Sequence, residues 1–83
     1  MAKRYEFGEK ERHSLTVDWS LISKRLRVEL YGALVSEEWH LSPRASRFEL
    51  DVGSSEHHHV EVLAGGFHPT EVIVDGKKIP PAA

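Results

Sequence analysis

The feature that most constrains the fold is a series of short runs in which apolar and polar residues alternate. The stretch 59–79 is the clearest example, because it holds two apolar runs of strand composition joined by a connection with glycines and a proline. Asp75-Gly76 then predicts a two-residue type I′ hairpin turn into a last short run. Alternation with period 2 is typical of strands with one buried face.

The same alternation recurs upstream in residues 13–19, 25–31 and 48–52, with turn residues between the runs. Their spacing is that of an antiparallel fold and not of βαβ units. We therefore expect an all-β fold, an antiparallel β-sandwich of about 6–8 strands. The positions expected to point inward are Leu15, Val17, Trp19, Leu26, Val28, Leu30, Trp39, Phe48, Leu50, Val52, Val60, Val62, Val72 and Val74.

Two segments leave alternatives open. Residues 1–10 are mostly charged and read either as an N-terminal arm or as an edge strand that carries Tyr5 and Phe7. Residues 33–41 fit a strand or a short helix, and the β context favours the strand. We expect one sandwich domain over residues 11–80 and a tail at 81–83.

Composition excludes several function classes. The chain has 83 residues, no cysteine and a formal net charge of −2, so disulfides and cysteine-based zinc sites are ruled out. A nucleic-acid-binding domain is usually strongly basic, and this one is not. No apolar run is long enough to span a membrane, so we expect no membrane partner and a cytoplasmic protein.

Three histidines are candidate metal ligands. In a strand, His57 and His59 point the same way, and His68 or Glu61 on a neighbouring strand is the expected third ligand. Zinc signatures normally have a second half at a defined spacing, which is missing here. The competing interpretation is a solvated polar face, and we expect no cofactor.

No catalytic constellation is visible, so we expect a protein that is not an enzyme. Glu37 and Glu38 are adjacent, and adjacent residues of a strand point to opposite faces, which prevents them from acting together as an acid and a base. No serine lies in a nucleophile elbow, and no phosphate-binding glycine motif occurs.

One basic stripe is a candidate interaction surface. Arg25 and Arg27 share an outward face, with Tyr31 close behind them. Such a stripe either binds a partner or keeps an exposed strand from pairing with other chains.

Several motifs occur together, in order, over residues 12–80: Ser23-Lys24-Arg25 before a strand, Glu38-Trp39 after a glycine turn, Phe48-x-Leu50-x-Val52-Gly53, and the ending Val72 to Pro80. In this combination the chain resembles one lobe of the Fas apoptotic inhibitory molecule family. That resemblance implies a compact antiparallel β-sandwich, regulation of cell death and survival through protein contacts, and no catalytic residues. The chain departs from the family in having a single lobe and in lacking the glycine-bearing loop before the Lys-Arg pair.

Together these observations predict a non-enzymatic protein-interaction module that binds a protein partner or itself. The alternative is a module for a small ligand or carbohydrate, with Tyr31, Trp39 or Phe67 as its platform.

Overall fold

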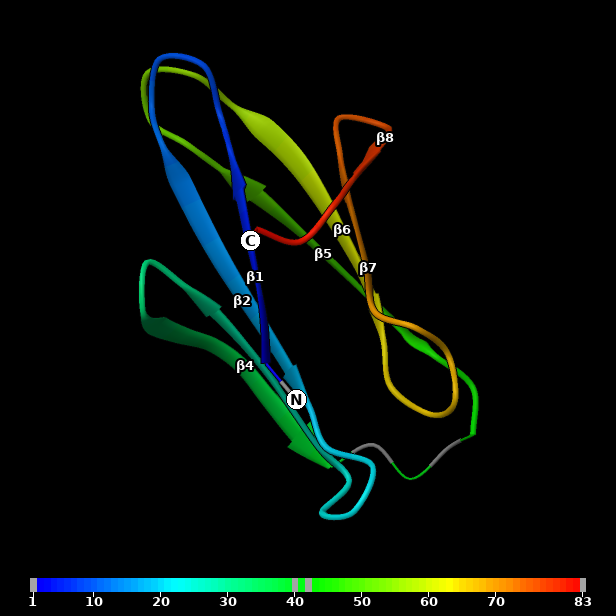
Figure 1. The fold of residues 1–83 in the computed structure, drawn as a ribbon. Helices are drawn as coiled ribbons and strands as arrows, with labels where there is room; N and C mark the ends of the chain where they lie inside the picture. The colour runs from blue at the N-terminus through cyan, green and yellow to red at the C-terminus, as the bar shows by residue number, and fades with distance from the viewer. Residues whose placement is uncertain (1, 40, 42, 83) are drawn as a thin grey trace.

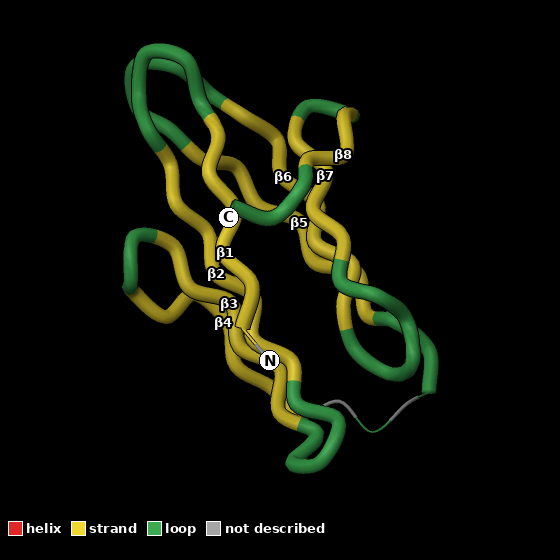
Figure 2. Tube along the Cα trace, in the orientation of Figure 1, coloured by secondary structure: helices red, strands yellow, loops and turns green. Residues whose placement is uncertain are grey.

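A computed structural model describes residues 2–39, 41 and 43–82 and contains two four-stranded antiparallel sheets (Figure 1). The described residues include no helix (Figure 2). The first sheet consists of β1 (Ala2–Phe7), β2 (His13–Trp19), β3 (Arg25–Leu30) and β4 (Ala33–Trp39). The second sheet consists of β5 (Ser46–Val52), β6 (His58–Ala64), β7 (Glu71–Val74) and β8 (Lys77–Ile79). In each sheet the strands lie side by side in chain order. The predicted all-β sandwich is thus confirmed.

The core lies between the two sheets, where the alternating apolar positions meet. The buried residues are Tyr5, Phe7, Leu15, Val17, Leu26, Val28, Val52, Val60, Val62, Ala64, Val72 and Val74. Trp19, Leu30, Phe48 and Leu50 are partly buried against them. Period-2 alternation therefore predicted most of the inward positions and missed the buried Tyr5, Phe7 and Ala64.

Trp39 is the inward position that was predicted wrongly, since it is 62% exposed. It lies opposite Arg25, whose neighbour Leu26 is buried, so Trp39 belongs to the outer face of the first sheet. A bulge in the β3–β4 pairing leaves Val35 without a partner on β3 and shifts the register between the two ends of β4. Residues 33–39 form a strand, as favoured over the helix.

β1 is an edge strand with a buried face. Tyr5 and Phe7 alternate with exposed residues and belong to the core. Near the end of the chain, the Ala82 N–H donates a hydrogen bond to the Arg4 carbonyl at 2.7 Å, so the C-terminal segment runs against this edge. The N-terminal segment therefore contributes to the sandwich itself.

The two sheets repeat one local pattern. A glycine with positive φ ends the first strand, a glutamate follows three residues later, and a histidine two residues after that begins the next strand. The positions are Gly8, Glu11 and His13 in the first sheet and Gly53, Glu56 and His58 in the second, 45 residues further along. The two β-hairpins that follow also correspond: Tyr31-Gly32 and Asp75-Gly76 both have positive φ at both residues, as in a type I′ turn.

This repeat brings equivalent parts of the two sheets together. The β1–β2 loop and the β5–β6 loop lie beside each other at one end of the sandwich (Figure 1). The residues that follow each loop therefore meet at the same end, and the candidate site lies there.

Candidate functional site

Each of the two loops carries a glutamate whose carboxylate accepts hydrogen bonds from the backbone of the other loop. The Glu11 carboxylate accepts hydrogen bonds from the N–H groups of Ser54 at 3.1 Å, Ser55 at 2.8 Å and Glu56 at 2.9 Å. The Ser54 hydroxyl donates a further one at 2.8 Å. Because these bonds favour the ionised form, they lower the pKa of Glu11 to about 2, the N–H of Glu56 having the largest effect.

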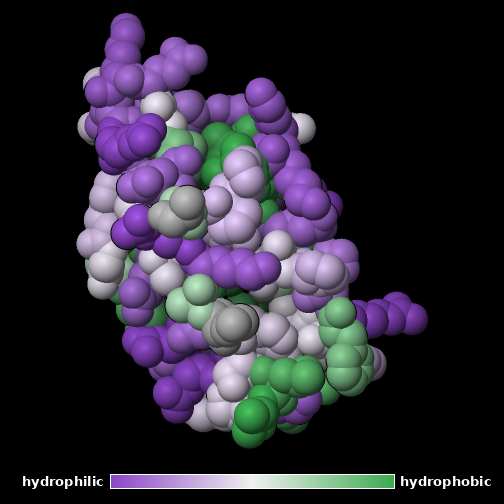
Figure 3. Space-filling view, viewed as in Figure 1, coloured by the Kyte–Doolittle hydropathy of each residue, from purple (hydrophilic) through white to green (hydrophobic). Residues whose placement is uncertain are grey.

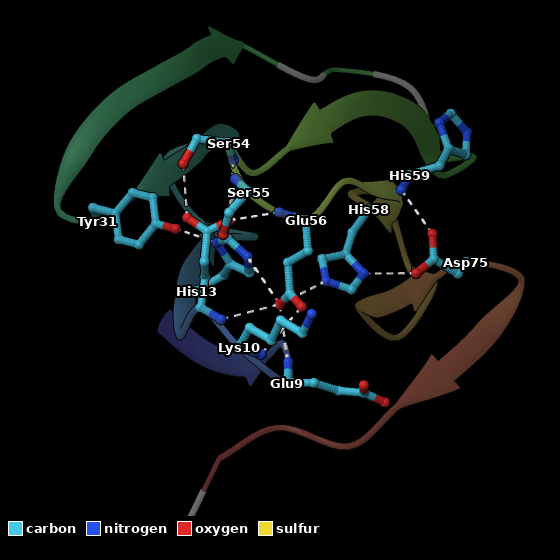
Figure 4. A network of polar contacts seen from close by, with 11 residues as sticks. Glu9, Lys10, His13, Tyr31, Ser54, Ser55, Glu56, His58, His59 and Asp75 are labelled. Carbon is cyan, nitrogen blue, oxygen red and sulfur yellow. Dashed lines mark hydrogen bonds and ion pairs between the residues drawn. The ribbon is translucent and has the colours of Figure 1, made fainter.

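Glu56 performs the reciprocal function for the first loop (Figure 4). Its carboxylate accepts from the N–H groups of Glu9 at 2.9 Å, Lys10 at 3.1 Å and Glu11 at 3.3 Å. The pKa of Glu56 is lowered to about 2, first by the N–H of Lys10 and next by His58. Each loop thus supplies the anion that satisfies the backbone donors of the other, which ties the two sheets together.

Glycine is required where each loop begins. A Cβ at Gly8, with φ of +112°, would lie 1.9 Å from the Glu11 carbonyl oxygen. At Gly53, with φ of +119°, it would lie 1.7 Å from the Glu56 carbonyl oxygen. Both the positive φ and the lack of room for a Cβ atom require glycine, so the conformation of each loop depends on Gly8 or Gly53.

His13 and His58 are oriented by the equivalent type I′ turns. Nδ1 of His13 is hydrogen-bonded to the Tyr31 hydroxyl. Nδ1 of His58 donates to Asp75 Oδ2 at 2.6 Å, and Asp75 also accepts from the backbone N–H of His59 at 2.9 Å. In both cases a residue of the turn between the third and fourth strands of the sheet is hydrogen-bonded to Nδ1, and Nε2 points toward Glu56 of the β5–β6 loop.

The two Nε2 atoms converge on one carboxylate oxygen. Oε1 of Glu56 lies 3.1 Å from His58 Nε2 and 3.7 Å from His13 Nε2. The side chain of His13 is fully buried, and its Nε2 has no hydrogen-bond partner among the described residues. Asp75, followed by Glu56, raises the pKa of His58, which favours an imidazolium ion between two carboxylates.

The histidines predicted as metal ligands are placed differently. His59 is half exposed and lies 3.4 Å from Glu49 and 3.2 Å from Asp51, of which Asp51 contributes more to its raised pKa. His68 lies 3.0 Å from Glu71 on the surface, and His57 is exposed. Among the described residues, the two groups with mutually close ligand atoms are His13, Glu56 and His58, and Glu49, His59 and Glu61.

The buried histidine group was missed in the sequence because its members look like ordinary strand and loop positions. His13 and His58 each fall on the core face of a strand, and Glu56 is one of many acidic residues. The available signal was the repeated Gly-x-x-Glu-x-His pattern, which is itself a clue that two equivalent loops exist.

The arginines of the basic stripe contact residues of their own sheet. Arg27 forms ion pairs with Glu37 at 3.1 Å and with Glu29 at 3.4 Å, and the Arg25 guanidinium lies 5.0 Å from the centre of the Trp39 ring. The two arginines therefore hold β4 against β3, while the exposed ring of Tyr31 directs its hydroxyl to His13.

β4 is the exposed edge of the first sheet. Six of its seven residues are exposed, among them Leu34, Val35 and Trp39, and no described strand pairs with its outer side. Leu21 and Ile22 in the β2–β3 turn are exposed as well, and hydrophobic residues gather around this turn at the lower edge of the molecule (Figure 3). This combination is unusual, because edge strands are normally covered or short.

The three aromatic residues predicted as alternative ligand platforms lie in different elements. Tyr31 lies in the β3–β4 turn, Trp39 at the end of β4, and Phe67 in the β6–β7 loop. A shallow pocket of about 450 Å³ lies elsewhere, lined by Thr70, Lys78, Ile79, Pro80 and Pro81. All three aromatic residues are exposed, as a ligand platform requires.

Comparison of the chain with family models, curated proteins and solved structures gave no match. Within the described part of the chain, no helix has the length and apolar character needed to cross a membrane.

Proposed function

We propose that this chain is a non-enzymatic protein-interaction module whose contact surface is the β4 edge and whose partner is a second copy of the same chain. The observation that supports the proposal most strongly is the seven-residue β4, which exposes apolar side chains and has an unpaired outer side among the described strands. Strand addition at such an edge supplies backbone hydrogen bonds, and the side chains supply buried apolar area.

Charge permits antiparallel self-association in a register centred on Ser36. Antiparallel pairing centred on Ser36 places Ala33 of one copy opposite Trp39 of the other, so that a small side chain faces a large one. Glu37 and Glu38 then lie opposite Val35 and Leu34. Registers centred on Glu37 or Glu38 place like charges opposite each other, which is destabilising.

Two further points support a protein-binding role in the cytoplasm. The absence of cysteine suits a reducing compartment but does not require one. The resemblance to the Fas apoptotic inhibitory molecule family, whose lobes act through protein contacts, points to the same class of function.

Sedimentation velocity tests the proposal. We expect wild-type protein to dimerise in the micromolar range and the Val35→Glu variant to stay monomeric, because its new carboxylate faces Glu37 of the second copy. Phe67→Glu is the matched control, since Phe67 is an exposed apolar residue in the β6–β7 loop and should leave the dimer intact. A wild-type monomer at every concentration, or a dimer that Val35→Glu leaves unchanged, contradicts the proposal.

A further inference from the structure

We infer that His13, Glu56 and His58 form a binding site for one divalent transition-metal ion of the zinc class. One potential ligand atom of each of these three residues lies within 4.8 Å of those of the other two. Nε2 of the fully buried His13 has no hydrogen-bond partner among the described residues, and such a group normally has one. The inference concerns a different surface from β4 and is independent of self-association.

The distances fit a single ion. Zinc binds nitrogen and oxygen at about 2.0–2.2 Å in a tetrahedral arrangement, which separates its donor atoms by about 3.3 Å. The observed separations from Glu56 Oε1 are 3.1 Å to His58 and 3.7 Å to His13. Each of these two separations differs from the tetrahedral value of about 3.3 Å by only a few tenths of an ångström, so the Glu56 oxygen can share one ion with either histidine.

The outer partners are those that metal-bound histidines require. A histidine that binds metal through Nε2 almost always has Nδ1 held by a carboxylate, carbonyl or other acceptor. Asp75 accepts from Nδ1 of His58, and the Tyr31 oxygen lies at Nδ1 of His13. When Nδ1–H of His13 donates to Tyr31, the Nε2 lone pair faces the Glu56 carboxylate. Two acceptors so placed repel each other unless a cation lies between them.

A proton competes with the metal ion. Without metal, the Nε2–H of His58 donates to Glu56 at 3.1 Å, so binding must displace this proton. Glu56 also remains anchored by the N–H groups of the first loop, which keeps its carboxylate in place for the ion. Metal affinity should therefore increase as the pH rises.

The donor set selects the class of ion. Two imidazoles and one carboxylate suit zinc, cobalt or nickel, whereas magnesium and calcium prefer oxygen ligands alone. The side chains of His58 and Glu56 are 15% and 17% exposed, so water can reach the fourth position. The other group, Glu49, His59 and Glu61, lies largely on the surface and lacks an unpartnered buried donor.

Isothermal titration of chelator-treated, full-length protein with zinc chloride at pH 7.5 tests the site. We expect one ion per chain, retained in the His57→Ala/His59→Ala double variant and weakened at least 100-fold in His58→Gln. Asp75→Asn should weaken binding about 10–100-fold, as is usual for outer partners. Asp51→Asn, which alters the equivalent contact of His59, should have no effect. Magnesium chloride should give no saturable heat.

Circular dichroism of each variant establishes that it is folded, and His13→Gln provides a second ligand variant beside His58→Gln. Absence of saturable zinc binding by the wild-type protein overturns the inference. So does zinc binding that folded His58→Gln retains and that the His57→Ala/His59→Ala variant loses, since the surface histidines would then be the ligands.

Discussion

Replacement of Gly53 by alanine should destabilise the protein far more than the same replacement at Gly76. Both glycines have positive φ, +119° and +80°, so alanine is unfavourable at each. The space around them differs. A Cβ at Gly76 meets no atom within 4 Å, whereas at Gly53 it would lie 1.7 Å from the Glu56 carbonyl oxygen, half of the 3.4 Å at which ordinary contact begins.

The magnitudes follow from these contacts. Left-handed backbone costs an L-residue about 1–2 kcal/mol, which is the whole effect expected at Gly76. At Gly53 the loop must also move away from the new methyl group, which adds about 1–3 kcal/mol of strain. The movement separates the Glu56 N–H from the Glu11 carboxylate, now 2.9 Å away. A total of about 2–5 kcal/mol is a large part of the roughly 4–12 kcal/mol expected for a chain of this length.

Urea denaturation followed by tryptophan fluorescence measures the two free energies of unfolding. We expect the free energy of unfolding of Gly53→Ala to lie about 1–3 kcal/mol below that of Gly76→Ala. The repeat supplies a matched second pair, because Gly8→Ala should behave like Gly53→Ala and Gly32→Ala like Gly76→Ala. If Gly53→Ala and Gly76→Ala differ by less than about 1 kcal/mol, the contacts of Glu11 and Glu56 with the opposite loops do not stabilise the sandwich.

Other predictions concern acid stability and the core. Because the pKa values of Glu11 and Glu56 are lowered from 4.5 to about 2, their stabilisation is complete above pH 5 and disappears as the pH falls toward 2. Urea midpoints measured from pH 6 to pH 2 should fall accordingly, and less steeply in Glu11→Gln; equal slopes count against the loop contacts. Leu15→Ala should cost about 2–5 kcal/mol, since Leu15 is fully buried, and a loss below 1 kcal/mol in the same assay would be inconsistent with this core. Trp19→Ala should cost about 3 kcal/mol because Trp19 packs on the core and donates to the Gly66 carbonyl. Trp39→Ala should cost less than about 1 kcal/mol, and the reverse order of the two tryptophans would refute the assignment of faces.

The fold was predictable because its signal is local. In β2, β3 and β6 each buried residue alternates with a more exposed one, and Asp75-Gly76 forms the expected type I′ turn. Trp39 was misplaced because alternation shows which residues share a face and not which face is covered. On β4 the face that carries Trp39 is the outer one.

The candidate site was not predictable from the alternation of apolar and polar residues alone. His13 and Glu56 are 43 residues apart in the sequence, and their proximity depends on how the two sheets pack. His57 and His59 drew attention because they are consecutive with His58, yet of these three it is His58 whose Nε2 faces the interior cluster. Recognition of the repeated Gly-x-x-Glu-x-His pattern would have pointed to the pair of histidines that the loops bring together.

The most direct test of the account is a nitrogen-15 NMR spectrum of the histidine side chains during zinc titration. The chain has six histidines, few enough to resolve and assign individually. We predict that Nε2 of His13 and Nε2 of His58 shift together and saturate at one zinc ion per chain, while His57, His59 and His68 remain unchanged. Shifts confined to His57, His59 or His68 would contradict the central claim that the two loops build a metal site at the end of the sandwich.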